Sequence, residues 1–232
     1  MCKVRFDVIS LFPEAFKNFF NHGLIKKSFE ENIASIHLHN PRDYAIDNYR
    51  KVDDEPYGGG VGMVLKPEPY FSAFETIPKL NKKKVLLMTP QGRKIAQSDF
   101  CRWSKQDQLI MICGSYEGFD ERIRSLSDEE ISLGDFVLTG GEIPAITIIN
   151  GVVRLLPGTL GSSESLKDES HNDFLLEHPQ YTRPSDFRGL KVPDVLLSGN
   201  HKLIKEWRQR QREIRTQSRR PDLYELWKLD QL

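Results

Sequence analysis

Two short apolar runs that each lead into glycine constrain the fold of this chain most strongly. The first, Leu109–Cys113, is followed by Gly114, and the second, Ile131–Leu138, is followed by Gly140 and Gly141. Apolar runs of this length, bounded by glycine, are typical of buried strands that end in tight turns. In an open sheet flanked by helices, small ligands bind where the carboxyl ends of the strands lead into loops. The pattern therefore predicts an α/β fold with a ligand site between these two turns.

The sequence contains neither of the two standard phosphate-binding motifs. No G-x-x-x-x-G-K-[ST] occurs, and the glycine-rich segment Tyr57–Met63 does not match G-x-G-x-x-G. Glycine turns also follow strands in α/β proteins without binding a ligand, so the pattern alone leaves a plain structural turn open. A ligand held at this position would be bound mostly by backbone groups, which glycine leaves accessible.

Composition indicates a globular protein, with 38% hydrophobic and 28% charged residues. No apolar run approaches the roughly 20 residues of a membrane-spanning helix, and the first residues lack the long apolar core of a secretory signal. The three cysteines are widely spaced, which predicts neither a disulfide framework nor a C-x-x-C metal site. His37 and His39 have no third ligand near them in the sequence. We therefore expect a cytoplasmic protein without membrane association and without a metal site that the sequence identifies.

Charge is unevenly distributed, although the formal net charge is zero. Residues 202–220 contain eight Lys or Arg residues and two Glu residues, a local net charge of +6. Leu203, Ile204 and Trp207 recur at helical spacing, which predicts an amphipathic helix over His201–Ser218. Such asymmetry is expected where one part of a chain meets nucleic acid. The alternative is a solvated helix that packs on Trp207 and binds nothing.

A polar segment divides the chain. Residues 162–172 are rich in Ser, Lys and acidic residues and contain few apolar ones, a composition typical of a flexible linker. We therefore expect residues 1–161 to form the α/β domain and residues 173–232 to form a small, mainly helical domain that binds RNA.

Seven blocks of sequence together carry a resemblance to a known family. They are DDEPYGGGVGM (Asp53–Met63), TPQGR (Thr89–Arg93), CGSYEGFDER (Cys113–Arg122), SLGDFVLTGGEIPA (Ser132–Ala145), RLLPGTLG (Arg154–Gly161), PQYTRP (Pro179–Pro184) and RRPDL (Arg219–Leu223). In order and spacing they closely resemble the bacterial tRNA (guanine-N1)-methyltransferase family, TrmD, of the SPOUT class. The resemblance covers nearly the whole chain.

The resemblance implies a fold, an activity and partners. The fold is a SPOUT-type parallel sheet with a deep trefoil knot, although knots are otherwise almost absent from proteins. The activity is transfer of a methyl group from S-adenosyl-L-methionine to N1 of guanosine 37 of tRNA, just 3′ of the anticodon. The resemblance also implies a homodimer whose active site lies between the subunits, with tRNA and not DNA as partner. It implies dependence on magnesium, for which this sequence identifies no ligands.

The resemblance also assigns site residues. Cofactor contacts are implied for Thr89, Pro90, Gly114, Tyr116, Glu117, Gly118, Leu133, Gly134, Asp135, Phe136, Val137, Leu138, Gly140, Gly141 and Pro144. Substrate contacts are expected for Asp53, Tyr57, Gly58, Gly59, Ser165, Ser170, Tyr181, Arg183, Arg208, Arg215, Arg219 and Arg220. On the residues alone, Asp53 to Gly59 are an exposed turn. Thr89–Arg93 is expected to be a turn beside the cofactor.

Methylation of guanine N1 requires a base for the N1 proton, a group that stabilises negative charge on O6, and an aligned methyl donor. The family places the charge-stabilising arginine before a P-G-x-L-G turn, and here that residue is Arg154. Without the family, Arg154 is a surface arginine at a helix end. The family's base is the aspartate of an Asp-Ser pair, but the matching position here is Glu169, with Asp168 before it. Both acids remain candidates, and we favour Glu169 because Ser170 follows it.

Two other functions remain open on the sequence. The departure at Glu169 allows a non-catalytic RNA-binding protein on the same scaffold. A different SPOUT enzyme, acting on rRNA or on a ribose hydroxyl, is the second alternative. Methyl transfer to an unmodified tRNA transcript, followed by mapping of the modified atom, separates all three.

Overall fold

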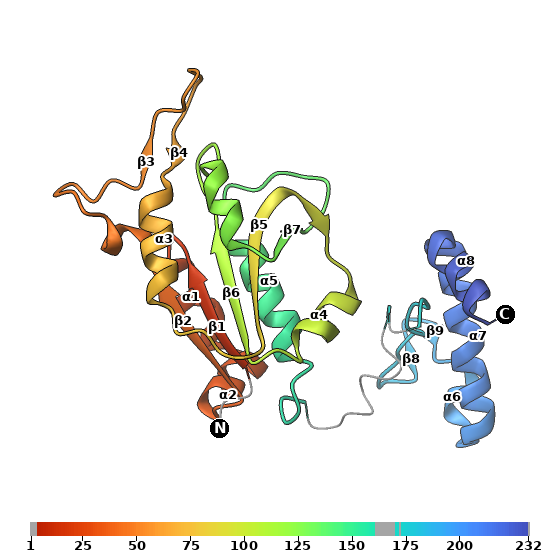
Figure 1. Cartoon of the computed structure of the whole chain (residues 1–232). Helices are drawn as coiled ribbons and strands as arrows, with labels where there is room; N and C mark the ends of the chain where they lie inside the picture. Colours follow the sequence, from red (N-terminus) through yellow and green to blue (C-terminus); the bar gives the residue numbers. More distant parts are fainter. Residues whose placement is uncertain (1–3, 161–169, 172, 232) are drawn as a thin grey trace. The chain divides into compact units, whose positions relative to one another are not determined.

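The computed structural model describes residues 4–160, 170, 171 and 173–231. Its internal contacts divide the chain into two compact units, Met1–Gly161 and Ser162–Leu232 (Figure 1). Most of the expected linker, residues 162–172, lies outside the described residues. Within the described part of the chain, no helix is both long enough and apolar enough to cross a membrane.

Unit 1 alternates strands and helices along the chain. Its elements are β1 (Val4–Ile9), α1 (Glu14–Lys17), η1 (Phe19–Asn21), α2 (Gly23–Glu30), β2 (Ala34–His39), η2 (Pro41–Tyr44), β3 (Asp53–Asp54), β4 (Val64–Leu65), α3 (Pro67–Thr76), β5 (Lys83–Lys94), α4 (Gln97–Trp103), β6 (Gln108–Cys113), η3 (Glu121–Leu126), β7 (Glu129–Ser132) and α5 (Glu142–Val153). Five of the strands form a parallel sheet in the order β2-β1-β6-β5-β7, and β3 and β4 form a separate antiparallel hairpin. The expected α/β class with a parallel sheet is therefore confirmed.

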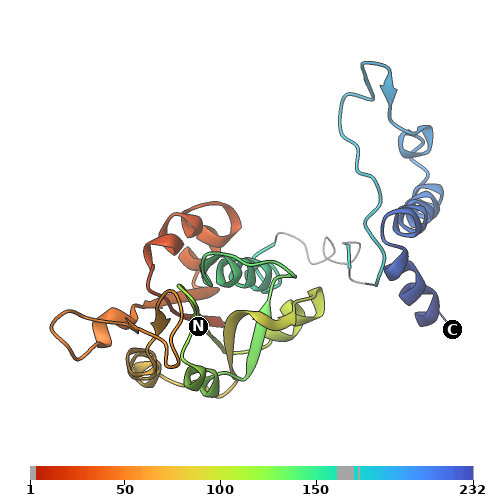
Figure 2. The same cartoon turned by 90° about the horizontal axis from the view of Figure 1, so that it is seen from above.

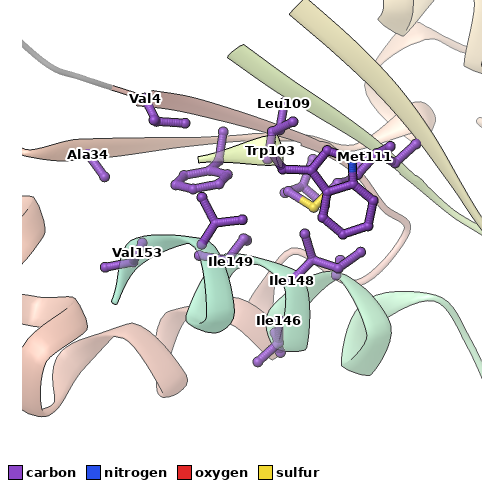
Figure 3. Packing of buried hydrophobic residues seen from close by; sticks show 14 of the residues in the cluster. Val4, Ala34, Trp103, Leu109, Met111, Ile146, Ile148, Ile149 and Val153 are labelled. Carbon is purple, nitrogen blue, oxygen red and sulfur yellow. The ribbon is translucent and has the colours of Figure 1, made fainter. Parts of the chain in front are cut away.

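The sheet is buried on both faces, as the apolar runs predict. Successive side chains of β6 enter different cores: Leu109 and Met111 pack on one face, and Ile110 and Ile112 pack on the other. Helix α5 covers the first face, and α3 with η3 covers the second (Figure 2). Figure 3 shows Ile148 of α5 between the helix and the sheet.

The prediction of a strand over Ile131–Leu138 is wrong after Ser132. β7 ends at Ser132, and residues 133–141 form a loop. The Ser132 hydroxyl donates to the Gly134 carbonyl at 2.8 Å, and the Phe136 N–H donates to the same carbonyl at 2.9 Å. This local turn takes the chain out of the sheet, which an apolar run in the sequence cannot reveal.

The turn expected over Thr89–Arg93 is also wrong. These residues belong to β5, whose pairing with β7 shifts register between Met88 and Arg93. A Cβ atom on Gly92 would lie 2.4 Å from the backbone nitrogen of Ile131, so only glycine lets the strand continue this close to β7. The segment is a bulge within a strand.

A buried carboxylate joins the edge and the centre of the sheet. Asp7 on β1 is fully buried and is bonded by Arg5 at 2.8 Å, by the Gln108 side chain at 2.7 Å and by His39 Nε2 at 2.9 Å. Burial by itself would raise the pKa of Asp7, but the hydrogen bonds from Arg5, His39 and Gln108 outweigh burial and hold the pKa well below its usual value.

Replacing Asp7 with asparagine should lower the free energy of unfolding by about 3 kcal/mol at pH 7, because Arg5 and His39 lose a buried anionic partner. Because the pKa of Asp7 is depressed in the fold, its contribution is present above its unfolded pKa of about 3.9 and is lost as the pH falls toward the folded value. Urea unfolding at pH 7 and at pH 3 should show the difference between wild type and variant shrinking at pH 3. Asp43→Asn is the control. It breaks the exposed 3.3 Å pair with Arg50 and should change stability by less than about 1 kcal/mol at either pH.

Unit 2 is mainly helical. Its elements are β8 (Asp186–Phe187), β9 (Leu190–Lys191), α6 (Asp194–Leu197), α7 (His201–Arg219) and α8 (Pro221–Asp230). The helix expected over His201–Ser218 is confirmed and runs one residue further. One of its basic residues, Arg212, is buried and pairs with Asp173, so the positive charge of α7 is not all at the surface.

Candidate active site

A cavity of about 360 Å³ lies at the carboxyl ends of the central strands of unit 1. Its walls come from three segments that follow or interrupt parallel strands: the bulge of β5, the segment after β6, and the loop after β7. We call it the glycine-loop cavity. Its lining residues are Met88, Thr89, Pro90, Gln91, Gly114, Ser115, Tyr116, Glu117, Gly118, Phe119, Glu121, Arg124, Ile131, Ser132, Leu133, Phe136, Val137, Leu138, Thr139, Gly140, Gly141 and Pro144.

The structure brings together most of the residues expected at a cofactor site. Thirteen of the fifteen line this cavity, and the two that do not are Gly134 and Asp135. The Asp135 side chain is exposed and pairs with Lys94 at 2.9 Å. The Gly134 carbonyl accepts the hydrogen bonds that close the turn after β7.

Two glycines of the cavity, Gly140 and Gly141, are required by the packing of the chain against itself. The Gly141 N–H donates to the Gly114 carbonyl at 2.9 Å, which joins the loop after β7 to the end of β6. A Cβ atom on Gly141 would lie 2.7 Å from the Cα of Cys113, and one on Gly140 would lie 2.3 Å from a carboxylate oxygen of Glu142. Glycine therefore shapes the cavity by letting two loops approach each other, and the backbone that faces the cavity follows from that approach.

Polar anchors hold these loops from outside the cavity. The Ser10 hydroxyl donates to the buried Glu142 carboxylate at 2.6 Å and accepts from the Phe12 N–H at 2.9 Å, which ties the end of β1 to the start of α5. The Tyr70 hydroxyl donates to the Cys113 carbonyl at 3.0 Å. Burial raises the pKa of both Tyr70 and Cys113 well above their usual values, so both groups stay neutral and the Cys113 thiol is no nucleophile near pH 7.

Sequence reasoning missed a charged group in the cavity wall, Arg124 on η3. Its guanidinium donates to Glu121 at 2.8 Å and to the Gln91 side chain at 2.6 Å, and it also pairs with Glu130. Glu117 also lines the cavity, and its carboxylate has no side-chain partner among the described residues. Because Arg124 is neutralised, the cavity keeps the negative charge of Glu117, which favours a cationic ligand.

The hairpin of β3 and β4 is attached to the cavity wall. The Glu117 N–H donates to the Met63 carbonyl at 3.2 Å, and the Leu65 N–H donates to the Gly118 carbonyl at 3.0 Å. The segment between the two strands carries Tyr57, which is fully exposed, and Gly58 and Gly59, which have positive φ values of 88° and 80°. The residues expected to touch substrate, Asp53 to Gly59, are thus on a projecting hairpin anchored beside the cavity (Figure 1).

The structure does not bring Arg154 to the cavity of its own chain. Helix α5 begins beside the cavity, where Pro144 lines it, and Arg154 caps the other end. Arg154 follows Pro144 by ten positions, about 15 Å along the helix at a rise of about 1.5 Å per residue. Within one chain, the proposed charge-stabilising group is therefore held away from the glycine-loop cavity.

Other expected residues fall in different places. Glu169, Asp168 and Ser165 lie outside the described residues. The Ser170 hydroxyl accepts from the Glu177 N–H at 2.9 Å. In unit 2, a second pocket is lined by Tyr181, Arg183 and Arg208. The remaining expected residues lie on α7 or at its end. Arg215 is half-buried, Arg219 is exposed, and Arg220 pairs with Asp222 at 2.6 Å.

No cluster of three or more His, Cys, Asp or Glu side chains that could hold a metal ion is found in the described part of the chain. His39, one of the two histidines considered from the sequence, is bonded to Asp7 in the sheet.

Comparison with known proteins identifies the family. The model of the family described as tRNA (Guanine-1)-methyltransferase TrmD matches residues 4–226. The chain belongs to the TrmD family. The resemblance expected from the seven sequence blocks is thus confirmed.

Curated TrmD relatives named tRNA (guanine-N(1)-)-methyltransferase match the chain along nearly its whole length. The protein from Synechococcus sp. (strain CC9311) is 64% identical over 228 residues, which are 98% of this chain and 95% of the relative. That from Trichodesmium erythraeum (strain IMS101) is 60% identical over 221 residues, 95% of this chain and 97% of the relative. That from Synechocystis sp. (strain ATCC 27184 / PCC 6803 / Kazusa) is 58% identical over 224 residues, 97% of each.

Proposed function

We propose that this chain transfers a methyl group from S-adenosyl-L-methionine to N1 of guanosine 37 of tRNA. The observation that carries the proposal is the glycine-loop cavity, which lies where parallel strands end, in a chain that belongs to a methyltransferase family. Ligands of open α/β sheets bind at this edge. A tRNA substrate also implies that the chain acts in the cytoplasm.

The chemistry of the cavity fits the proposed methyl donor. The donor supplies an electrophilic methyl group on a positively charged sulfur. Apolar side chains such as Leu138 and Pro144 can enclose its adenine ring, and the backbone at Gly114 and Gly140 can bond its edge. Glu117 has an unpaired carboxylate in the lining, which suits the positively charged ammonium and sulfonium groups of the donor. Magnesium dependence is part of the proposal, without assigned ligands.

Arg154 and one acidic side chain would act on guanine. The acid, Glu169 or Asp168, takes the N1 proton, so that the N1 lone pair becomes available. The Arg154 guanidinium stabilises the negative charge that gathers on O6 as the proton leaves. The hairpin residues Asp53 to Gly59 would hold the nucleotide beside the cavity.

The distance between Arg154 and the cavity supports a homodimeric active site. Ile143, Thr147, Asn150 and Arg154 follow one another at helical spacing on α5, and none is fully buried. The nearby Val137 is 80% exposed. A twofold axis that packs this face of α5 antiparallel against its copy would cover apolar surface. It would also set Arg154 of each chain beside the cavity of the other.

We propose further that the loops around the cavity form the trefoil knot of the SPOUT class. The hydrogen bond between Gly141 and Gly114 supports this proposal, because it joins the two loops where they meet. For unit 2 we propose tRNA binding, with exposed basic residues of α7 such as Arg208 and Arg219 contacting phosphates.

Methyl transfer to matched transcripts tests the function. The purified chain, labelled donor and unmodified tRNA with guanosine at position 37 should yield 1-methylguanosine at that position, identified after nuclease digestion. A transcript with adenosine at position 37 should accept no label there. RNA binding without transfer, or a 2′-O-methyl product, would reject the proposal in favour of an RNA-binding protein or another SPOUT activity.

A further inference from the structure

Unit 2 contains a pocket of its own, separate from the glycine-loop cavity. It has a volume of about 320 Å³ and is lined by residues of the segment 178–185, by Val192, and by residues of helices α6 and α7. This volume is at the lower end of the range of small-ligand pockets, about 300–1,000 Å³. The pocket is therefore large enough for one small planar ligand with an attached polar group.

A buried histidine supplies a polar group in this pocket. His178 is only 6% exposed and lines the pocket. Its Nδ1 lies 3.2 Å from the Pro179 carbonyl oxygen, which can only accept, so the contact is a hydrogen bond in the tautomer that carries the proton on Nδ1. Nε2 is then a hydrogen-bond acceptor, and it has no partner among the described residues. This nitrogen is accessible and remains free to accept a hydrogen bond from a ligand or from water.

The other walls are apolar, aromatic and cationic. Val192, Leu196 and Ile204 give apolar surface, and Tyr181 adds an aromatic ring that is 48% exposed. The Tyr181 ring is tilted by 51° to that of Trp207 at 6.4 Å, so the two rings are not stacked face to face. One face of Tyr181 is thus accessible to another planar group.

Two arginines stand at the rim. Arg183 and Arg208 line the pocket and are exposed, and neither guanidinium has an ion-pair or hydrogen-bond partner in the described part of the chain. Two guanidinium groups without partners, at the rim of an aromatic and apolar pocket, are complementary to a planar base that carries a phosphate.

We propose that this pocket binds one unstacked nucleotide of the tRNA, other than guanosine 37. Its base lies against Tyr181 and the apolar wall, an N–H of its edge donates to His178 Nε2, and its phosphate is bonded by Arg183 and Arg208. The inference rests on the proposed function, because it takes tRNA to be the substrate. It adds a site at which unit 2 selects an extruded base in addition to its contacts with phosphates.

A set of tRNA transcripts, each lacking a single base, tests the site. Abasic positions are placed one at a time through the anticodon arm, excluding position 37, and the Kd of the full-length chain is measured at constant salt. For wild type, one position should weaken binding by about 5–150-fold, the loss that follows removal of one stacked base. With Tyr181→Ala, intact tRNA should bind more weakly by a similar factor, and the same abasic position should then have no further effect.

Three further variants separate the pocket from general effects. Tyr181→Phe keeps the ring and should preserve the position-specific loss. Ile204→Trp fills the pocket and should abolish that loss, provided that circular dichroism and thermal unfolding match those of wild type. Arg210→Gln removes an exposed charge of α7 outside the pocket, and should weaken binding of every transcript equally while leaving the position-specific loss in place.

The outcomes distinguish the two proposals. If wild type binds all abasic transcripts equally, or if the loss at one position persists in Tyr181→Ala and Ile204→Trp, no base is bound here and the inference is overturned. A pocket that binds a peptide instead would give the first of these results. Failure of the proposed function would appear separately, as absence of methyl transfer to intact tRNA by wild type.

Discussion

Replacement of Arg154 with alanine is expected to reduce the rate of methyl transfer by roughly 10²–10³-fold while leaving the affinity for S-adenosyl-L-methionine nearly unchanged. The size of the effect is that of removing one preorganised donor from a developing negative charge. Affinity for the donor should persist because the donor is held by the residues that line the glycine-loop cavity, and Arg154 is not one of them. Single-turnover rates and equilibrium dialysis with labelled donor measure the two quantities. Arg154→Lys keeps the positive charge but lacks the planar guanidinium with its several N–H donors. Its rate of methyl transfer should lie between those of Arg154→Ala and wild type.

Mixed dimers test whether Arg154 acts in the other subunit. Leu138→Arg places a bulky cation on a half-exposed residue of the cavity lining, and should prevent donor binding without disturbing the core. A heterodimer with Arg154→Ala in one chain and Leu138→Arg in the other contains one site with an intact cavity and an intact arginine, if the site is shared. About half of wild-type activity is then expected. If Arg154 served its own chain, neither site would be complete and activity would be lost.

The second large effect is expected from the general base. Glu169→Gln should reduce single-turnover methyl transfer by roughly 10²–10⁴-fold at every pH between 6 and 9, because the amide cannot accept the N1 proton. Asp168→Asn should have a much smaller effect. The choice rests on sequence spacing: both acids lie outside the described residues, and Ser170, which follows Glu169, is bonded to the Glu177 N–H at 2.9 Å.

The pH dependence separates loss of the base from loss of substrate binding. If Glu169 is the base, the variant's slow rate should rise with pH as hydroxide replaces the carboxylate, whereas the tRNA Kd should stay close to that of wild type. A large loss in Asp168→Asn with a near-normal Glu169→Gln would reverse the assignment. If both variants keep rates within a few-fold of wild type, the base is neither of these acids.

Local sequence pattern predicted the central strand and most segments of the cavity. Leu109 to Cys113 is an apolar run typical of a buried strand, and the alternation within it separates the two cores. The glycine-containing blocks that follow Cys113 and Ile131 supply most of the cavity lining, because the carboxyl ends of parallel strands meet at one edge of the sheet. The basic helix α7 was likewise predicted from the helical spacing of its apolar residues and from its charge.

Details that depend on contacts between distant segments could not be predicted from the sequence. The end of β7 at Ser132 is set by a turn that an apolar run conceals, and the continuation of β5 through Gly92 depends on its approach to Ile131. Arg124 enters the cavity wall because Gln91, Glu121 and Glu130 hold it, and only Glu121 lies near it in sequence.

The amino-acid sequence by itself therefore determined the family, the parallel α/β sheet and the segments that form the cavity, because periodicity and short motifs act over a few neighbouring residues. Only the tertiary structure decided that Gly141 lets the loop after β7 pack against the end of β6, that Arg154 is held away from the cavity of its own chain, and that His178 lines a pocket in unit 2. These features depend on which distant segments meet, and that is fixed by packing of the whole chain.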